Sequence, residues 1–128
     1  LLLTVADIMR TGKDNPIVKE REKVSEVLLK ITQSRAGSAT VVDKSGKLTG
    51  IFTDGDLRRN LKTDARMPFR NISEVMTKNP SVITEDMLAA EAMRIMQDRR
   101  IDELPVIDKK RRPVGLLDVQ DLLKAGLV

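Results

Sequence analysis

Two polar side chains, Thr53 and Asp56, lie three residues apart where an apolar run ends and a polar segment begins. The pattern around them is typical of a β-strand followed by a short helix. A helix start presents unpaired backbone N–H groups and the positive end of the helix dipole, and both favour a bound anion. A threonine hydroxyl can bind a phosphate oxygen there, while an acceptor-only carboxylate suits the hydroxyls of a ribose. This chemistry is that of a nucleotide-binding site.

The same spacing has a purely structural interpretation. A threonine followed three residues later by an acidic residue can form a capping box, in which the two side chains satisfy only the helix's own donors. The nearby Gly50 and Gly55 permit a close backbone approach or unusual dihedral angles. The motif by itself favours neither interpretation.

The segment that contains this motif occurs twice in the chain. Residues 50–57 (GIFTDGDL) return 65 residues later as residues 115–122 (GLLDVQDL). An internal repeat of this period indicates two copies of one supersecondary unit. Copies of roughly 60 residues bury too little surface to be stable alone. We therefore expect two repeats, residues 1–64 and 65–128, that fold against each other.

Hydrophobic periodicity predicts the main helix of each repeat. Apolar residues at 24, 27, 28 and 31 share one face of a helix that ends near Ser34. The equivalent helix of the second repeat is predicted to begin after Thr84, a good N-cap, with Glu85 and Asp86 in its first turn.

Short β-branched or aliphatic runs predict the strands, and polar turns join the later ones into hairpins. The strands are expected at 17–18, 39–42, 48–52, 82–83, 104–107 and 114–117, and short helices at about 54–61 and 119–124. Each repeat thus has the predicted order strand, helix, strand, strand, helix, which belongs to the α/β (α+β) class.

The composition narrows the possible chemistry. With no Cys and no His, the chain lacks disulfides, thiolate metal ligands and the commonest general base, so we expect no metal. No apolar run approaches a membrane span and no segment resembles a signal peptide, so we expect a cytoplasmic protein without a membrane partner. The net charge of +4 is shared by both halves and no Tyr or Trp is present for base stacking, which argues against a nucleic-acid partner.

With the duplicated architecture, residues 50–57 resemble the ligand motif of a cystathionine-β-synthase-type (CBS) domain pair, also called a Bateman module. The resemblance covers essentially the whole chain. It implies two CBS repeats packed with pseudo-two-fold symmetry, and a nucleotide site in the cleft between them marked by Gly, two apolar residues, Thr or Ser, two variable residues and Asp.

Carried over to this sequence, the resemblance makes Thr53 the phosphate contact and Asp56 the ribose contact. The lips of the base pocket would come from residues 16–18 and 38–40, and Arg58 could reach an anionic ligand. The residues expected to contact ligand are therefore Thr53, Asp56, Asp54, Gly50, Arg58, Ile17, Val18, Ser38, Ala39, Thr40 and Asp121.

The second repeat departs from the motif because Asp118 stands where the first repeat has Thr53, while Asp121 keeps the position of Asp56. An extra carboxylate repels a phosphate. We expect one competent site in the first repeat and a degenerate or empty one in the second, although Asp121 could still hold a sugar. Alternatively, Asp118 serves only as a helix N-cap.

Residues 50–59 and 116–126 further resemble the C-terminal part of bacterial arabinose-5-phosphate isomerases. In that family a sugar-isomerase (SIS) domain precedes the CBS pair and interconverts ribulose 5-phosphate and arabinose 5-phosphate, in the synthesis of the lipopolysaccharide sugar Kdo. The resemblance implies that this chain is a non-catalytic, regulatory piece that requires no cofactor and binds a nucleotide effector such as AMP, ATP or the nucleotide sugar CMP-Kdo.

Two other functions are compatible with the sequence. The pair could be purely structural, forming a homodimer of CBS pairs, and a tetramer in the parent enzyme, through apolar helix faces. Nucleic-acid binding is a third possibility, which predicts steeply salt-dependent association.

Overall fold

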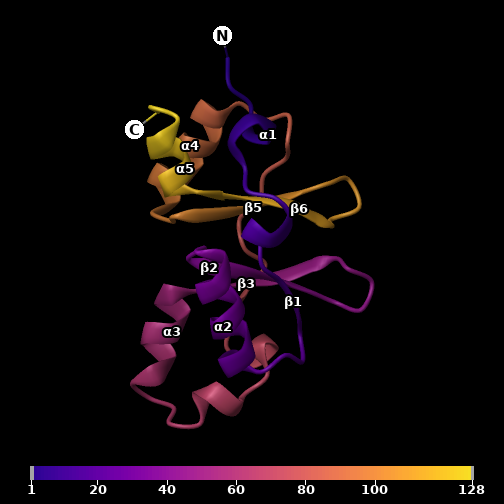
Figure 1. Ribbon diagram of the computed structural model, residues 1–128, viewed down its shortest axis with the longest axis vertical. Coiled ribbons are helices and arrows are strands. Elements are labelled where there is room, and N and C mark those ends of the chain that lie inside the picture. Colours follow the sequence, from indigo (N-terminus) through magenta and orange to yellow (C-terminus); the bar gives the residue numbers. More distant parts are fainter. Residues whose placement is uncertain (1, 128) are drawn as a thin grey trace.

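The computed structural model describes residues 2–127, which form two similar units with their strands in the middle of the molecule and helices on the outer sides (Figure 1). The first unit contains β1 (Ile17–Lys19), α2 (Val24–Ser34), β2 (Ser38–Val42), β3 (Leu48–Thr53) and α3 (Asp54–Leu61). The second contains α4 (Ala89–Arg99), β5 (Glu103–Ile107), β6 (Pro113–Asp118) and α5 (Val119–Lys124). The predicted α/β class and the duplication are confirmed.

The sheets of the two units differ in size. In the first unit β1 runs parallel to β2, and β3 pairs antiparallel with both β2 and the two-residue β4 (Thr77–Lys78). In the second unit β5 and β6 form a two-stranded sheet, an antiparallel hairpin. The strand predicted at 82–83 is wrong, because that segment forms only a single bridge between Ile83 and Val106.

The predicted start of the second long helix is also wrong. α4 begins at Ala89, after Leu88, and the Thr84 hydroxyl donates to Asp86 (2.6 Å) instead of capping the helix. Leu88 forms a β-bridge with Thr4, so a partner distant in sequence fixes where the helix begins. The residues around Thr84 do not indicate that Leu88 pairs with Thr4, so the sequence could not predict this helix start.

Each unit is completed by a segment from the other half of the chain. The short helix α1 (Val5–Ile8) buries Val5 in the core of the second unit. Met67, Ile72 and Val75 are buried in the core of the first unit, which they reach from beyond α3. Each of the two separate cores therefore contains residues from both halves of the chain, while the boundary at residue 64 stays a prediction.

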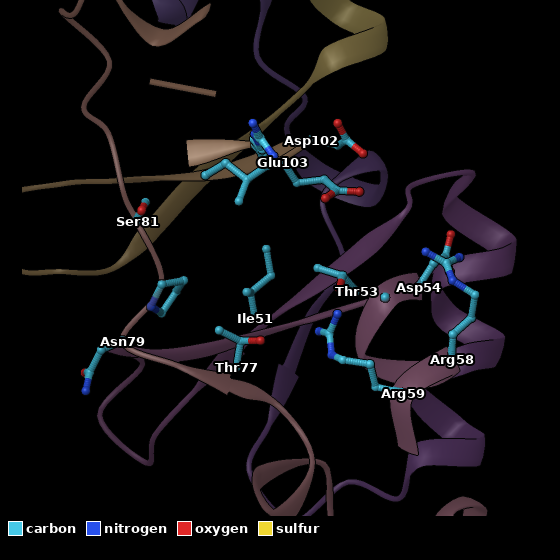
Figure 2. A pocket seen from close by; sticks show the side chains of 14 residues that line it. Ile51, Thr53, Asp54, Arg58, Arg59, Thr77, Asn79, Ser81, Asp102 and Glu103 are labelled. Atoms are coloured by element: carbon cyan, nitrogen blue, oxygen red, sulfur yellow. The ribbon is translucent and has the colours of Figure 1, made fainter. Parts of the chain in front are cut away.

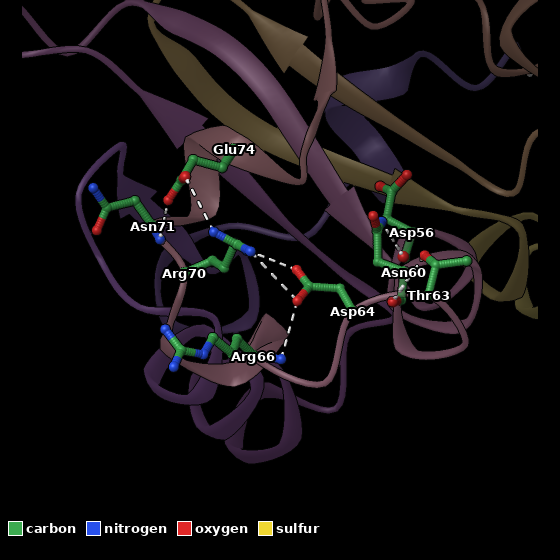
Figure 3. Close-up of polar contacts among 8 residues, drawn as sticks. All are labelled: Asp56, Asn60, Thr63, Asp64, Arg66, Arg70, Asn71 and Glu74. Atoms are coloured by element: carbon green, nitrogen blue, oxygen red, sulfur yellow. Dashed lines mark hydrogen bonds and ion pairs between the residues drawn. The ribbon is translucent and has the colours of Figure 1, made fainter.

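Ion pairs hold the link that follows α3 in a defined path (Figure 3). Arg70 Nε donates to Asp64 Oδ2 at 2.6 Å, and its Nη1 lies 3.9 Å from Glu74 Oε1. The hydrogen bond from Arg70 lowers the pKa of Asp64. The link thereby carries Met67 into the first core.

None of the helices within residues 2–127 has the length and apolar character that crossing a bilayer requires.

Candidate functional site: the cleft between the repeats

The Thr53 segment borders a cleft of about 560 Å³, which we call the first cleft (Figure 2). One wall is the junction of β3 and α3. The other wall comes from two segments of the second half of the chain. Residues 79–81 follow β4, and residues 100–103 lead from α4 into β5. The lining residues are Ile51, Thr53, Asp54, Gly55, Arg58, Arg59, Thr77, Asn79, Pro80, Ser81, Arg100, Ile101, Asp102 and Glu103.

Thr53 caps α3 and lines the first cleft at the same time. Its Oγ1 accepts a hydrogen bond from the backbone N–H of Asp56 at 3.3 Å, and Asp56 Oδ2 accepts from the backbone N–H of Thr53 at 3.0 Å. This is the capping box that the spacing allowed. The structural interpretation is therefore correct, and it leaves the anion-favouring start of an eight-residue helix at the lip of the cleft.

Asp56 is more enclosed than a ribose contact needs to be. The residue is 4% exposed, and its Oδ1 accepts hydrogen bonds from Arg59 Nη2 (2.6 Å) and Thr77 Oγ1 (2.8 Å). Both of those donors line the first cleft, whereas Asp56 lies behind them. A sugar hydroxyl that bonds to Asp56 must therefore displace Thr77 or Arg59.

Charges of both signs face the first cleft. Arg58 and Arg59 project from α3, and Arg100 ends α4 in a left-handed conformation (φ 54°). A left-handed residue is a common way for a helix to end, and Arg35 ends α2 in the same way (φ 57°). Asp54, Asp102 and Glu103 supply the negative charges, so the cleft can hold an anionic group beside polar or hydroxyl-bearing ones.

Glu103 has a pKa well above the ordinary value of a glutamate. Burial between the repeats, followed by the neighbouring charges of Asp118, Asp102 and Asp54, raises the pKa of Glu103 from 4.5 to about 7. Arg10 acts in the opposite direction and is outweighed. The carboxyl is therefore poised to change its charge near neutral pH.

The wall formed by residues 79–81 and 100–103 was missed by the sequence reasoning. That reasoning placed the base-pocket lips in the first repeat, at 16–18 and 38–40. The internal repeat contains a signal for this wall. NPSV at 79–82 matches NPIV at 15–18, and residues 16–18 were predicted to line the base pocket.

The structure does not bring the other predicted contacts to the first cleft. Val18, Ser38, Ala39 and Thr40 are buried within strands β1 and β2. Ile17 is 42% exposed but lines a separate depression, with Asn15 and Pro16 among its neighbours. Their roles in ligand binding stay predictions.

Gly50 has a packing explanation that involves no ligand. A Cβ at this position would overlap the Met76 side chain and lie 2.9 Å from the backbone oxygen of Thr77. The segment that forms β4 therefore crosses Gly50 at close range. Gly115 has the same relation to Met9 in the second unit.

Asp121 lies at a different depression of about 330 Å³, which we call the second depression. It is lined by Arg10, Asp14, Ser34, Arg35, Asp121 and Lys124. Arg10 Nε donates to both Asp121 carboxylate oxygens, at 3.1 and 3.2 Å. Asp118 caps α5, accepting from the backbone N–H of Gln120 at 2.8 Å. Asp118 thus acts as the N-cap of α5, and Arg10 occupies the Asp121 carboxylate that a sugar would need.

Among residues 2–127, no three His, Cys, Asp or Glu side chains gather in an arrangement that could hold a metal ion. The acidic residues that line the first cleft are therefore not arranged to bind a metal ion.

Comparisons with known proteins agree with this architecture. The family model of the CBS domain matches residues 5–63 and 72–128. The arabinose 5-phosphate isomerase KdsD of Pseudomonas aeruginosa is 42% identical over 128 residues, and that of Escherichia coli is 38% identical. In both cases the match covers 100% of this chain but only 39% of the relative, so the chain spans about two fifths of those enzymes.

A solved structure gives the same fold. The CBS domain pair of protein MJ0100, in complex with 5′-methylthioadenosine and S-adenosyl-L-methionine, superposes with a TM-score of 0.89 at 25% identity. The superposition covers 98% of this chain and 97% of that one.

Proposed function

This chain belongs to the CBS-domain family, and we propose that it is a regulatory, non-catalytic module that binds a nucleotide or nucleotide sugar in the first cleft. The observation that carries the proposal is the position of Thr53, which caps α3 and lines the cleft between the repeats. A phosphate at this helix start would meet the Thr53 hydroxyl and the backbone N–H groups of the first turn.

The charges around the cleft support a ligand with more than one polar group. Arg58 and Arg100 are suited to phosphate or carboxylate, because a guanidinium presents a planar set of donors. Asp56 would accept a ribose hydroxyl in place of the Thr77 hydroxyl. AMP and ATP present phosphate and ribose, and CMP-Kdo adds a carboxylate. The adenosyl ligands of the MJ0100 pair support a nucleoside-containing ligand.

The relatives suggest the parent protein. We propose that the chain is the C-terminal CBS pair of a longer arabinose-5-phosphate isomerase, in which an N-terminal SIS domain performs the chemistry. A nucleotide in the first cleft would then shift the equilibrium between arrangements of the catalytic domain. Such control requires unequal affinity for the two arrangements.

Calorimetric titration with AMP, ATP, CMP, CMP-Kdo and S-adenosyl-L-methionine tests the binding proposal. Thr53→Ala removes the hydroxyl at the cleft, and we expect affinity for the phosphate-bearing ligand to fall about 10- to 100-fold, as for a lost hydrogen bond to a charged group. Thr4→Ala is the matched control, because Thr4 begins a capping box on α1, away from the cleft.

Arg58→Ala supplies a second variant that leaves the α3 cap intact. Arg66→Ala, an exposed arginine outside the cleft, is its control. The binding proposal is wrong if no member of the panel binds, or if the cleft variants and their controls bind equally well.

A second candidate function is assembly. Leu29, Leu61 and Leu123 are 59%, 52% and 47% exposed on helices α2, α3 and α5. These exposed leucines could pack against a second copy, and we propose a homodimer of CBS pairs, with a tetramer in the parent enzyme. Sedimentation of the isolated chain as a monomer at high concentration would contradict the dimer.

A further inference from the structure

Two carboxylates face each other across the second hairpin. In the register of β5 and β6, Glu103 lies opposite Asp118, and like charges at directly opposed positions destabilise a strand pair. The equivalent pair in the first hairpin is Ser38 opposite Thr53, which is uncharged. Asp118, which stands where the first repeat has Thr53, therefore has two effects: it caps α5, and it forms a carboxyl pair with Glu103.

Both carboxylates converge on Gly37 of the first repeat. A Cβ placed there would lie 2.7 Å from Glu103 Oε1 and 3.8 Å from Asp118 Oδ2. The missing side chain of Gly37 thus leaves the space into which the Glu103 carboxyl turns. Glu103 also lines the first cleft, whereas Asp118 is buried at the start of α5. The pair consequently joins the ligand cleft to the interface between the repeats.

The charged groups around Glu103 disfavour its ionised form. Asp118 at the end of β6, Asp102 before β5 and Asp54 at the start of α3 all oppose a negative charge there. Arg10 is the cation that favours it, but Arg10 donates its Nε to Asp121 and its Nη1 to the carbonyl of Arg35 (3.2 Å). Within residues 2–127, no hydrogen bond or ion pair reaches the Glu103 carboxyl.

We propose that binding of an anionic ligand in the first cleft is coupled to uptake of a proton by Glu103, which faces Asp118 across the hairpin. This inference rests on the proposed function of the cleft. The cleft carries Arg58, Arg59 and Arg100, which attract the anion, and Asp54, Asp102 and Glu103, which repel it. Protonation removes one of those charges, so the neutral carboxyl and the bound anion stabilise each other.

The size of the coupling follows from Coulomb's law. A unit charge ~7 Å from the carboxyl, at an effective dielectric constant of ~30, changes the proton-binding equilibrium by about tenfold. Because binding and protonation are linked, the affinity for the anion changes by the same factor. The raised pKa of Glu103, about 7, places this change in the physiological range.

Titrations of the intact chain with CMP-Kdo and with AMP at pH 6.5 and 8.5 test the inference. We expect the dissociation constant of the wild-type chain to rise about sixfold over this range, relative to that of Glu103→Gln, because part of the tenfold effect lies outside these two pH values. The variant mimics the protonated carboxyl, so it should bind as tightly at pH 8.5 as the wild type does at pH 6.5. Comparison with the variant cancels the titration of the nucleotide itself.

Calorimetry at pH 7 in MOPS and in Tris counts the protons directly, because these buffers differ in ionisation enthalpy and neither supplies a phosphate that would compete for the cleft. The wild-type chain should take up about 0.4 proton more per ligand bound than Glu103→Gln. Glu85→Gln, an exposed carboxylate on the loop before α4, is the control and should match the wild type.

The outcomes separate the two proposals. Ligand binding whose pH dependence and proton uptake are the same in wild type and Glu103→Gln overturns the inference and leaves the binding function intact. If no member of the full ligand panel binds at either pH, the binding function is overturned, and the inference with it.

Discussion

Replacing Glu103 by Gln should stabilise the ligand-free protein, and the gain should grow with pH. The folded protein holds a proton on Glu103 more tightly than the unfolded chain does, since the pKa of this group is about 7 against an ordinary value of 4.5. The contribution of this carboxyl to stability is complete below pH 4.5 and is lost as the pH rises through 7. The neutral Gln side chain does not suffer that loss.

The expected magnitude follows from the same shift. The difference between 4.5 and about 7 corresponds to about 3 kcal/mol at most. The Glu103 side chain is only partly buried, so solvent screening reduces the effect to about 1–2 kcal/mol. The geometry agrees with a destabilising charge, because Asp118 is the cross-strand partner of Glu103.

Urea unfolding followed by circular dichroism at pH 4.5, 6 and 8 provides the measurement. The free energies of unfolding of Glu103→Gln and wild type should agree at pH 4.5, and the variant should exceed the wild type by about 1–2 kcal/mol at pH 8. Glu85→Gln should show no such growth. A constant difference between Glu103→Gln and wild type, or a variant less stable at pH 8, would refute the reasoning.

Further predictions concern packing and the second depression. Gly50→Ala should lower the free energy of unfolding by about 1–3 kcal/mol in urea, because the new methyl group overlaps Met76. Gly55→Ala is its control in α3: the nearest atom is the flexible Arg59 guanidinium at 3.1 Å, so it should be neutral or stabilising by up to about 1 kcal/mol. Arg10→Ala should cost about 1–3 kcal/mol in the same assay, because Asp121 would keep a largely buried charge without its partner; equal stability of variant and wild type would contradict this.

Most of the fold could be predicted because its signals are local and occur twice. The apolar positions 24, 27 and 31 lie one helical turn apart, and all of them are buried in α2. The hairpin turns carry Asp43 and Asp108, whose side chains accept backbone hydrogen bonds within each turn. These features depend on neighbours within a few residues, which a sequence displays directly.

The elements that could not be predicted depend on distant partners. β4 exists because Thr77 pairs with Ile51, and α4 begins where Leu88 meets Thr4. The same limit applies to the site. The start of α3 could be recognised from Thr53, but the wall around Arg100 becomes visible only when the repeats are packed together.

A crystal structure of this chain with a bound nucleotide tests the central claim most directly. We predict density in the first cleft, with a phosphate oxygen within hydrogen-bond distance of Thr53 Oγ1 and a ribose hydroxyl at Asp56 in place of Thr77. A nucleotide bound elsewhere, or a first cleft that stays empty in crystals grown at saturating nucleotide, would contradict the account.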